Sequence, residues 1–114
     1  MKVPFNINLS GKTAIVTGGS GTLCSAMAYG LAVSGAKVAI IGRNIEKLAS
    51  VSEKLTKNAL DEYNKGVTIK GYSCNVINKD ELTAAYETIK NELGSCDILI
   101  NGAGGNQPGA ITSI

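Results

Sequence analysis

The sequence predicts an α/β fold in which helices cover both faces of a doubly wound parallel sheet. Short apolar and β-branched runs alternate with longer segments of helical periodicity along the whole chain. Strand–helix units of this length need right-handed crossovers, which make the strands parallel and bury both faces of the sheet. The 114 residues suffice for one domain only. We therefore expect a single domain over 1–114 with the order β-α-β-α-β-α-β.

Four strands are expected, at residues 13–17, 37–41, 67–74 and 97–100. The first helix should begin at Leu23 and end before Gly35, because glycine suits the left-handed conformation that follows a helix. Helical spacing predicts that this helix faces the sheet with the stripe Leu23, Ala26, Met27, Gly30, Leu31 and Ser34.

The next two helices carry cap signals at both ends. Asn44 is the expected N-cap of the second helix, and Asn78 with Glu81 resembles a capping box at the third, which Gly94 ends. Spacing predicts that the second helix buries Ile45, Leu48, Ala49, Ser52, Leu55 and Ala59. The corresponding stripe of the third helix is Leu82, Ala85, Tyr86, Ile89 and Leu93.

Composition excludes several function classes. The net charge of +2 is small and scattered, so no nucleic-acid or membrane surface is expected, and no stretch approaches the ~20 apolar residues of a membrane span. Residues 1–10 do not resemble a secretory signal. Cys24, Cys74 and Cys96 lack CxxC spacing, and the chain has no histidine, so no metal site is expected. These features are typical of a cytoplasmic protein with reduced thiols.

A glycine-rich segment joins the first strand to the first helix. Residues 17–23 read Thr-Gly-Gly-Ser-Gly-Thr-Leu. Glycines let the backbone turn sharply and approach a pyrophosphate, and the following helix N-terminus favours an anion. The alternative is a plain tight connection, and no Gly-Lys-Ser/Thr follows that would indicate a nucleoside-triphosphate loop. We expect a phosphate cradle formed by Gly18, Ser20, Gly21, Thr22 and Leu23.

Two motifs give the chain a resemblance to a known family. Thr17 and Gly18 are in register with the TGxxxGxG signature of short-chain dehydrogenases/reductases, with Thr22 and Cys24 in place of its later glycines. The segment 101–104, Asn-Gly-Ala-Gly, is similar to the family's NNAG motif with glycine in the second place. Residues 19–28 and 104–108 are similar to a sugar-acid branch, the D-mannonate oxidoreductases. The resemblance covers nearly the whole chain from about residue 9.

The resemblance implies a Rossmann domain and assigns further cofactor residues. Asn75 and Val76 occupy the place of an Asp-Val pair beside the adenine, although Asn75 also suits an Asx turn before the next helix. Asn101, Ala103 and Gly104 would lie against the nicotinamide ribose at the carboxyl edge of the sheet.

The end of the second strand bears on the choice between NAD and NADP. Residues 41–44 read Ile-Gly-Arg-Asn, without the carboxylate that usually binds the ribose of NAD. Arg43 could instead face a 2′-phosphate through charge-assisted hydrogen bonds, or be a solvated arginine at a helix start. We expect NADP or NAD as the cofactor, with NADP favoured.

No catalytic residue is expected within the chain. Tyr86 and Lys90 match the family's Tyr-x-x-x-Lys, but they precede the NNAG-like segment and Tyr86 lies on an apolar stripe. The resemblance places the catalytic Ser, Tyr and Lys after residue 114, so the domain is expected to be cut short after its fourth strand.

For the parent protein, the resemblance implies hydride transfer between a nicotinamide cofactor and a hydroxyl or ketone carbon of a small molecule. Local similarity suggests a sugar acid such as mannonate or fructuronate, and a homo-oligomer is expected. The alternatives are a non-catalytic dinucleotide-binding module and an inactive fragment.

Overall fold

A computed structural model describes residues 8–18 and 21–102 of the chain. Its elements are β1 (Thr13–Thr17), α1 (Thr22–Val33), β2 (Lys37–Gly42), α2 (Ile45–Tyr63), β3 (Thr68–Ser73), α3 (Lys79–Glu92) and β4 (Ile98–Asn101). The four strands form one parallel sheet in the order β3-β2-β1-β4. The expected α/β fold is confirmed, with strand boundaries that differ from expectation by one residue or so.

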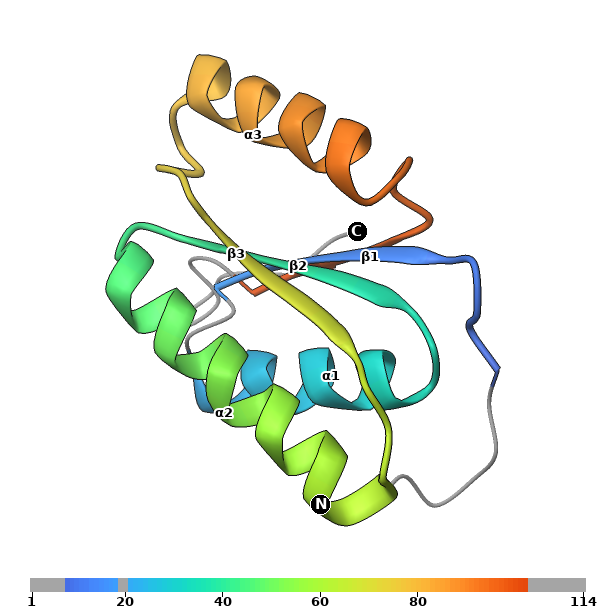
Figure 1. The fold of residues 1–114 in the computed structure, drawn as a ribbon. Helices are drawn as coiled ribbons and strands as arrows, with labels where there is room; N and C mark the ends of the chain where they lie inside the picture. Colours follow the sequence, from blue (N-terminus) through green and yellow to red (C-terminus); the bar gives the residue numbers. More distant parts are fainter. Residues whose placement is uncertain (1–7, 19–20, 103–114) are drawn as a thin grey trace.

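The helices cover the two faces of the sheet unequally. α1 and α2 lie on one face and α3 lies on the other (Figure 1). The chain runs outward from β1 to β2 and β3, and then α3 carries it back to pair β4 with the opposite side of β1. This reversal makes β1 and β4 the switch point of the sheet, where open α/β folds bind ligands.

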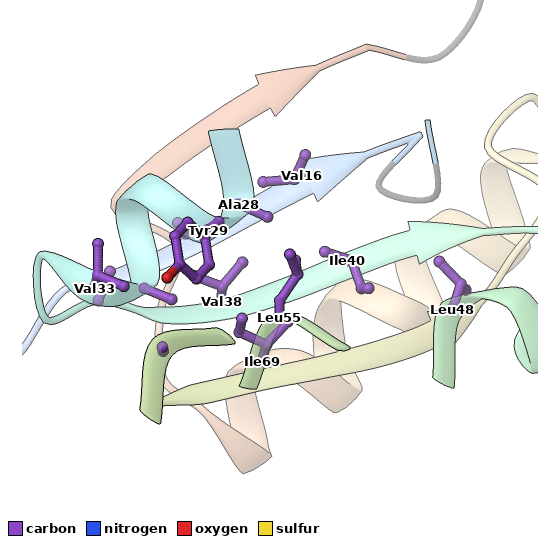
Figure 2. Close-up of a cluster of buried hydrophobic side chains, with 13 residues drawn as sticks. Val16, Ala28, Tyr29, Val33, Val38, Ile40, Leu48, Leu55 and Ile69 are labelled. Atoms are coloured by element: carbon purple, nitrogen blue, oxygen red, sulfur yellow. The ribbon is translucent and has the colours of Figure 1, made fainter. Parts of the chain in front are cut away.

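Alternate residues of the central strands fill two separate cores. Ala14 and Val16 face α1 and α2, whereas Ile15 faces α3. Figure 2 shows the larger core, to which the sheet contributes Val16, Val38, Ile40 and Ile69. The smaller core includes the whole predicted stripe of α3. Because β1 and β2 are buried on both faces, they hold the carboxyl edge of the sheet in place.

The predicted buried face of α1 is wrong at Leu23 and Met27, whereas Ser34 is buried as expected and Leu31 packs against the larger core. The residues that α1 buries are Ala28, Tyr29, Ala32 and Val33. Leu23 and Met27, which were expected to face the sheet, are 74% and 37% exposed. α1 is apolar on nearly all sides, so the spacing of its larger residues does not identify one face. Small alanines instead allow the helix to approach the sheet closely.

The α2 stripe is correct at Leu48, Leu55 and Ala59 but wrong at Ile45, which is 49% exposed, and at Ala49, which is exposed. Leu48 explains the rotation of the helix. A Cβ placed on Gly71 would lie 2.8 Å from the Leu48 Cβ, so this leucine fills the space that the glycine leaves. That contact turns Ala49 outward.

The expected helix caps and terminating glycines are present, but Glu81 has a different hydrogen-bond partner from the one expected. Asn44 caps α2 and Asn78 caps α3, each accepting from two backbone N–H groups of the first turn. Gly35 and Gly94 have φ values of +111° and +119°. The Glu81 carboxylate, however, accepts from the N–H of Asn75, at 3.2 Å. In place of the expected capping box, this hydrogen bond links the first turn of α3 to the segment that follows β3.

Within residues 8–18 and 21–102, none of the helices combines the length and apolarity that crossing a bilayer requires.

Candidate functional site

Four segments meet at the carboxyl edge of the sheet. Each of them follows one of the four strands. The parallel register brings the strand ends level with one another, since Thr17 of β1 is paired with Ile41 of β2 on one side and with Asn101 of β4 on the other. Most of the predicted cofactor residues stand in these segments. We call this carboxyl edge, with the four segments that follow the strands, the crevice.

The glycine-rich segment turns back sharply at Gly18, whose φ is +74°. Its N–H donates to the Ile41 carbonyl at 2.8 Å, and its carbonyl accepts from the Gly21 N–H at 3.0 Å. Gly21 is the N-cap of α1 and provides no side-chain cap, and no acidic residue stands in the first turn. The positive end of the helix therefore stays open toward an anion. Thr22 and Leu23 begin α1, while Ser20 lies outside the described residues.

Thr17 joins the two strands that border the crevice. Its buried hydroxyl donates to the Asn101 Oδ1 atom at 2.9 Å. The Gly102 N–H donates to the Thr17 carbonyl at 3.2 Å and approaches its hydroxyl oxygen at 3.1 Å. Sequence reasoning used Thr17 only as a motif marker and missed this role. A hydroxyl at the last position of a central strand was the available signal.

Cys24 and Gly102 are in close contact across the crevice. A Cβ added to Gly102 would lie 2.1 Å from the Cys24 Sγ and 3.0 Å from the Thr17 carbonyl oxygen. Cys24 is half-buried and packs against the larger core. The NNAG-like segment thus begins directly against α1. Its remaining predicted residues, Ala103 and Gly104, lie outside the described residues.

Arg43 and Asn75 come together from the ends of β2 and β3. The Arg43 Nη2 donates to the Asn75 Oδ1 at 3.3 Å, and the same oxygen accepts from the Ile77 N–H at 3.3 Å. The Ser73 hydroxyl donates to the Arg43 carbonyl at 3.0 Å. Asn75 is therefore both the turn residue and the arginine's partner. The exposed guanidinium is thereby held at the carboxyl edge of the sheet.

A hollow of about 220 Å³ lies on the α3 side of the sheet, between the ends of β1 and β4 and the segment that follows β3. It is lined by Thr17, Val76, Ile77, Leu82, Tyr86, Leu99 and Asn101. Val76, predicted beside the adenine, therefore shares a surface with Thr17 and Asn101. Ile77, which reasoning from the sequence did not single out, is 81% exposed next to it. An apolar surface beside polar strand ends suits a ligand that carries both rings and polar groups.

Tyr86 is built into the smaller core. It packs there and is half-buried. Burial raises the pKa of its hydroxyl, and the thiols of Cys96 and Cys74 add to the shift. A tyrosine that donates and accepts a proton near neutral pH needs a pKa close to that pH. The pKa of Tyr86 is instead shifted upward, away from neutral pH. Its environment favours packing over acid–base chemistry.

In the part of the chain that the structure describes, no three or more carboxylate or cysteine side chains gather as metal ligands would. Among its described residues, the crevice does offer a helix N-terminus without a side-chain cap, a tight glycine turn, an exposed cation after β2 and a glycine after β4. These groups fit a dinucleotide diphosphate.

Comparisons with known proteins agree with this geometry. The family model described as short chain dehydrogenase matches residues 12–114. An uncharacterized oxidoreductase of Bacillus subtilis is 46% identical over 112 residues, which are 98% of this chain and 38% of the relative. A 2-dehydro-3-deoxy-D-gluconate 5-dehydrogenase of Formosa agariphila is 40% identical over 98 residues, covering 85% of this chain and 34% of the relative.

Solved structures give the same result. A candidate D-mannonate oxidoreductase from Haemophilus influenza, solved with bound NAD, superposes with a TM-score of 0.77 at 37% identity. The match covers 96% of this chain and 36% of that structure. The chain thus spans little more than a third of the length of these proteins.

Proposed function

Because the chain belongs to the short-chain dehydrogenase family, we propose that it forms the nicotinamide-dinucleotide-binding part of an oxidoreductase. The whole protein would transfer a hydride between the cofactor and a hydroxyl or ketone carbon. The observation that carries the proposal is the junction of β1 and β4, where Thr17 and Asn101 are hydrogen-bonded beside an uncapped helix N-terminus. Domain boundaries of 1–114 are part of this proposal.

Each segment of the crevice receives one part of the cofactor in this proposal. Gly18, Gly21 and the first turn of α1 hold the pyrophosphate, with Ser20 beside them. Asn75 and Val76 border the adenine, and the segment from Asn101 through residues 103–104 supports the nicotinamide ribose. The cofactor supplies the hydride chemistry, while these residues bind and orient it.

We propose NADP as the preferred cofactor, with NAD as the alternative. Arg43 is exposed and is held by a neutral amide, so its charge is available to a 2′-phosphate. The Haemophilus structure was solved with NAD, which keeps the alternative open.

The proposed substrate is a sugar acid such as mannonate or fructuronate. Support comes from the names of the Haemophilus and Formosa proteins, both of which refer to sugar acids. The catalytic Ser, Tyr and Lys are proposed to follow residue 114, and a homo-oligomer is the proposed assembly. The proposed location is the cytoplasm, because Cys24, Cys74 and Cys96 are all free.

Gly21→Asp provides a sharp test of the cofactor site. Aspartate is a good N-cap, and Gly21 has an ordinary φ of −77°. Among the residues that the structure describes, a Cβ there would meet the Gly18 carbonyl oxygen at 3.4 Å, an ordinary contact. The substitution should preserve or raise the melting temperature while its charge repels a pyrophosphate. Gly21→Asn is the matched neutral control.

The measurement is calorimetric titration of the protein, as its gene encodes it, with NADP and NAD. We expect binding that Gly21→Asp weakens by at least about tenfold, or 1.4 kcal/mol, and Gly21→Asn much less. Absence of binding to either dinucleotide would contradict the proposed function. Oxidation of D-mannonate, followed by cofactor absorbance, tests the substrate separately.

A further inference from the structure

We infer that Cys24 and Gly102 form a size-matched pair that sets the distance between the first turn of α1 and the end of β4, and thereby positions the nicotinamide half of the dinucleotide. A Cβ at position 102 would overlap the Cys24 Sγ, from which it would be only 2.1 Å away. The glycines with positive φ among the described residues are Gly11, Gly18, Gly35 and Gly94, so Gly102 is needed for space and not for its conformation.

Compared with the family motifs, this chain has a larger residue at position 24 and a smaller residue at position 102. Position 24 corresponds to a glycine of TGxxxGxG and carries a thiol here, whereas position 102 corresponds to the second Asn of NNAG and carries none. The side chain that is absent at position 102, after β4, is matched by the additional side chain at position 24, in α1. In a close-packed interior, a change in the size of one side chain affects its neighbours. Each of the two departures from the motifs, at positions 24 and 102, should therefore be tolerated only together with the other.

The pair stands where a small shift affects the ligand. Cys24 lies in the first turn of α1, two residues after its start, and packs against the larger core. Gly102 is fixed by its N–H bond to the Thr17 carbonyl, so it cannot retreat without breaking the β1–β4 junction. A longer side chain at 102 would therefore push α1 and the end of β4 apart. Because its effect would be on ligand alignment, the pairing rests on the proposed dinucleotide site.

The test is a double-mutant cycle in the protein as its gene encodes it. Gly102→Ala introduces the overlap with the thiol, and Cys24→Ala removes it, because the two Cβ atoms of the double variant would be 3.8 Å apart, an ordinary contact. The approach of the new Cβ to the Thr17 carbonyl oxygen, at 3.0 Å, is the same in both Gly102→Ala backgrounds, so the difference between them reports the thiol alone. Two controls accompany the cycle. Cys24→Ser keeps the size of the side chain, and Gly30→Ala adds a methyl group to α1 where nothing lies within 4 Å.

Titration with NADP and with adenosine 2′,5′-bisphosphate, which lacks the nicotinamide half, separates positioning from folding. We expect Gly102→Ala to weaken NADP about tenfold or more, which corresponds to a loss of about 1.4 kcal/mol, because the displaced strand end would no longer fit the nicotinamide half. The fragment should stay within about threefold, and Cys24→Ala should restore most of the NADP affinity of Gly102→Ala. Cys24→Ser and Gly30→Ala should match the wild type.

The remaining outcomes are distinguishable. If the effects of Gly102→Ala and Cys24→Ala on NADP affinity are additive, the size-matched pair is overturned. The same holds if Gly102→Ala weakens NADP and the fragment equally. Either result leaves the proposed function intact. A wild type that binds neither of these ligands nor NAD would overturn both the pair and the proposed function. If Gly102→Ala does not fold, the double variant must fold and bind NADP, and its failure to do so would overturn the pair.

Discussion

The guanidinium of Arg43 is held by the side-chain oxygen of Asn75, at 3.3 Å, across the ends of β2 and β3. Asn75 is neutral, so it orients the arginine without cancelling its charge. A carboxylate at position 75 would form an ion pair instead. The two residues therefore act together on the proposed choice of cofactor.

Arg43→Ala should weaken NADP more than NAD. A hydrogen bond to a charged group contributes about 1.5–3 kcal/mol, which corresponds to roughly ten- to a hundredfold in affinity. Arg43 is exposed, so solvent screening favours the lower end of that range. Calorimetry with both cofactors measures the difference, and exposed Lys47 provides a control, as Lys47→Ala removes a nearby charge from the first turn of α2. Equal losses for NADP and NAD would mean that Arg43 is a surface residue only.

Asn75→Asp should lower the ratio of NADP to NAD affinity without removing the arginine. The new carboxylate would pair with the guanidinium and repel a 2′-phosphate, and about a tenfold change in the ratio is expected from one charged contact. The same substitution in the Arg43→Ala background should change the ratio less. An equal change in both backgrounds would show that Asn75 acts independently of Arg43.

Thr17→Val should destabilise the protein by about 1–3 kcal/mol, because it leaves the oxygen of Asn101 without its donor in a partly buried place. Thr17→Ser keeps the hydroxyl and loses one methyl group, so its cost should be about 0.8 kcal/mol. Urea unfolding of the three proteins gives the comparison. A serine variant as unstable as the valine variant would assign the effect to packing.

Tyr86→Phe should leave turnover of the whole protein within about threefold, far from the 10²- to 10⁴-fold contribution of a general acid. Phenylalanine fills the same place in the smaller core and lacks only the hydroxyl. The pH dependence of kcat/KM should also be unchanged. Loss of turnover together with loss of a titrating group would identify Tyr86 as the proton donor.

The order of elements could be predicted because each one carries its own local signals. Asn44 and Asn78 mark helix starts, Gly35 and Gly94 mark helix ends, and β-branched runs mark the strands. The buried face of α1 could not be predicted, because amphipathic spacing identifies a face only where the opposite face is polar.

The same distinction applies to the site. Strand ends could be located from the sequence, and with them Gly18, Arg43, Asn75 and Asn101. The contacts between segments could not be located, because Thr17 with Asn101 and Cys24 with Gly102 depend on strand register and helix rotation. Two departures from the family motifs, at positions 24 and 102, were visible in the sequence, but only the packing relates them to each other.

The placement of β1 between β2 and β4 constrains the order in which this sheet can form. Of its four strands, β1 emerges before the others and β4 after them, so the second edge of β1 is paired only once Asn101, 84 residues beyond Thr17, has been made. Before β4 docks, β1, β2 and β3 can already be paired, but one wall of the crevice does not exist. In the proposed site, the residues for the pyrophosphate and the adenine can then already be in place, whereas the support for the nicotinamide ribose, which begins at Asn101, cannot. A dinucleotide that contacts Asn101 would favour the docked strand over the open edge through its binding energy.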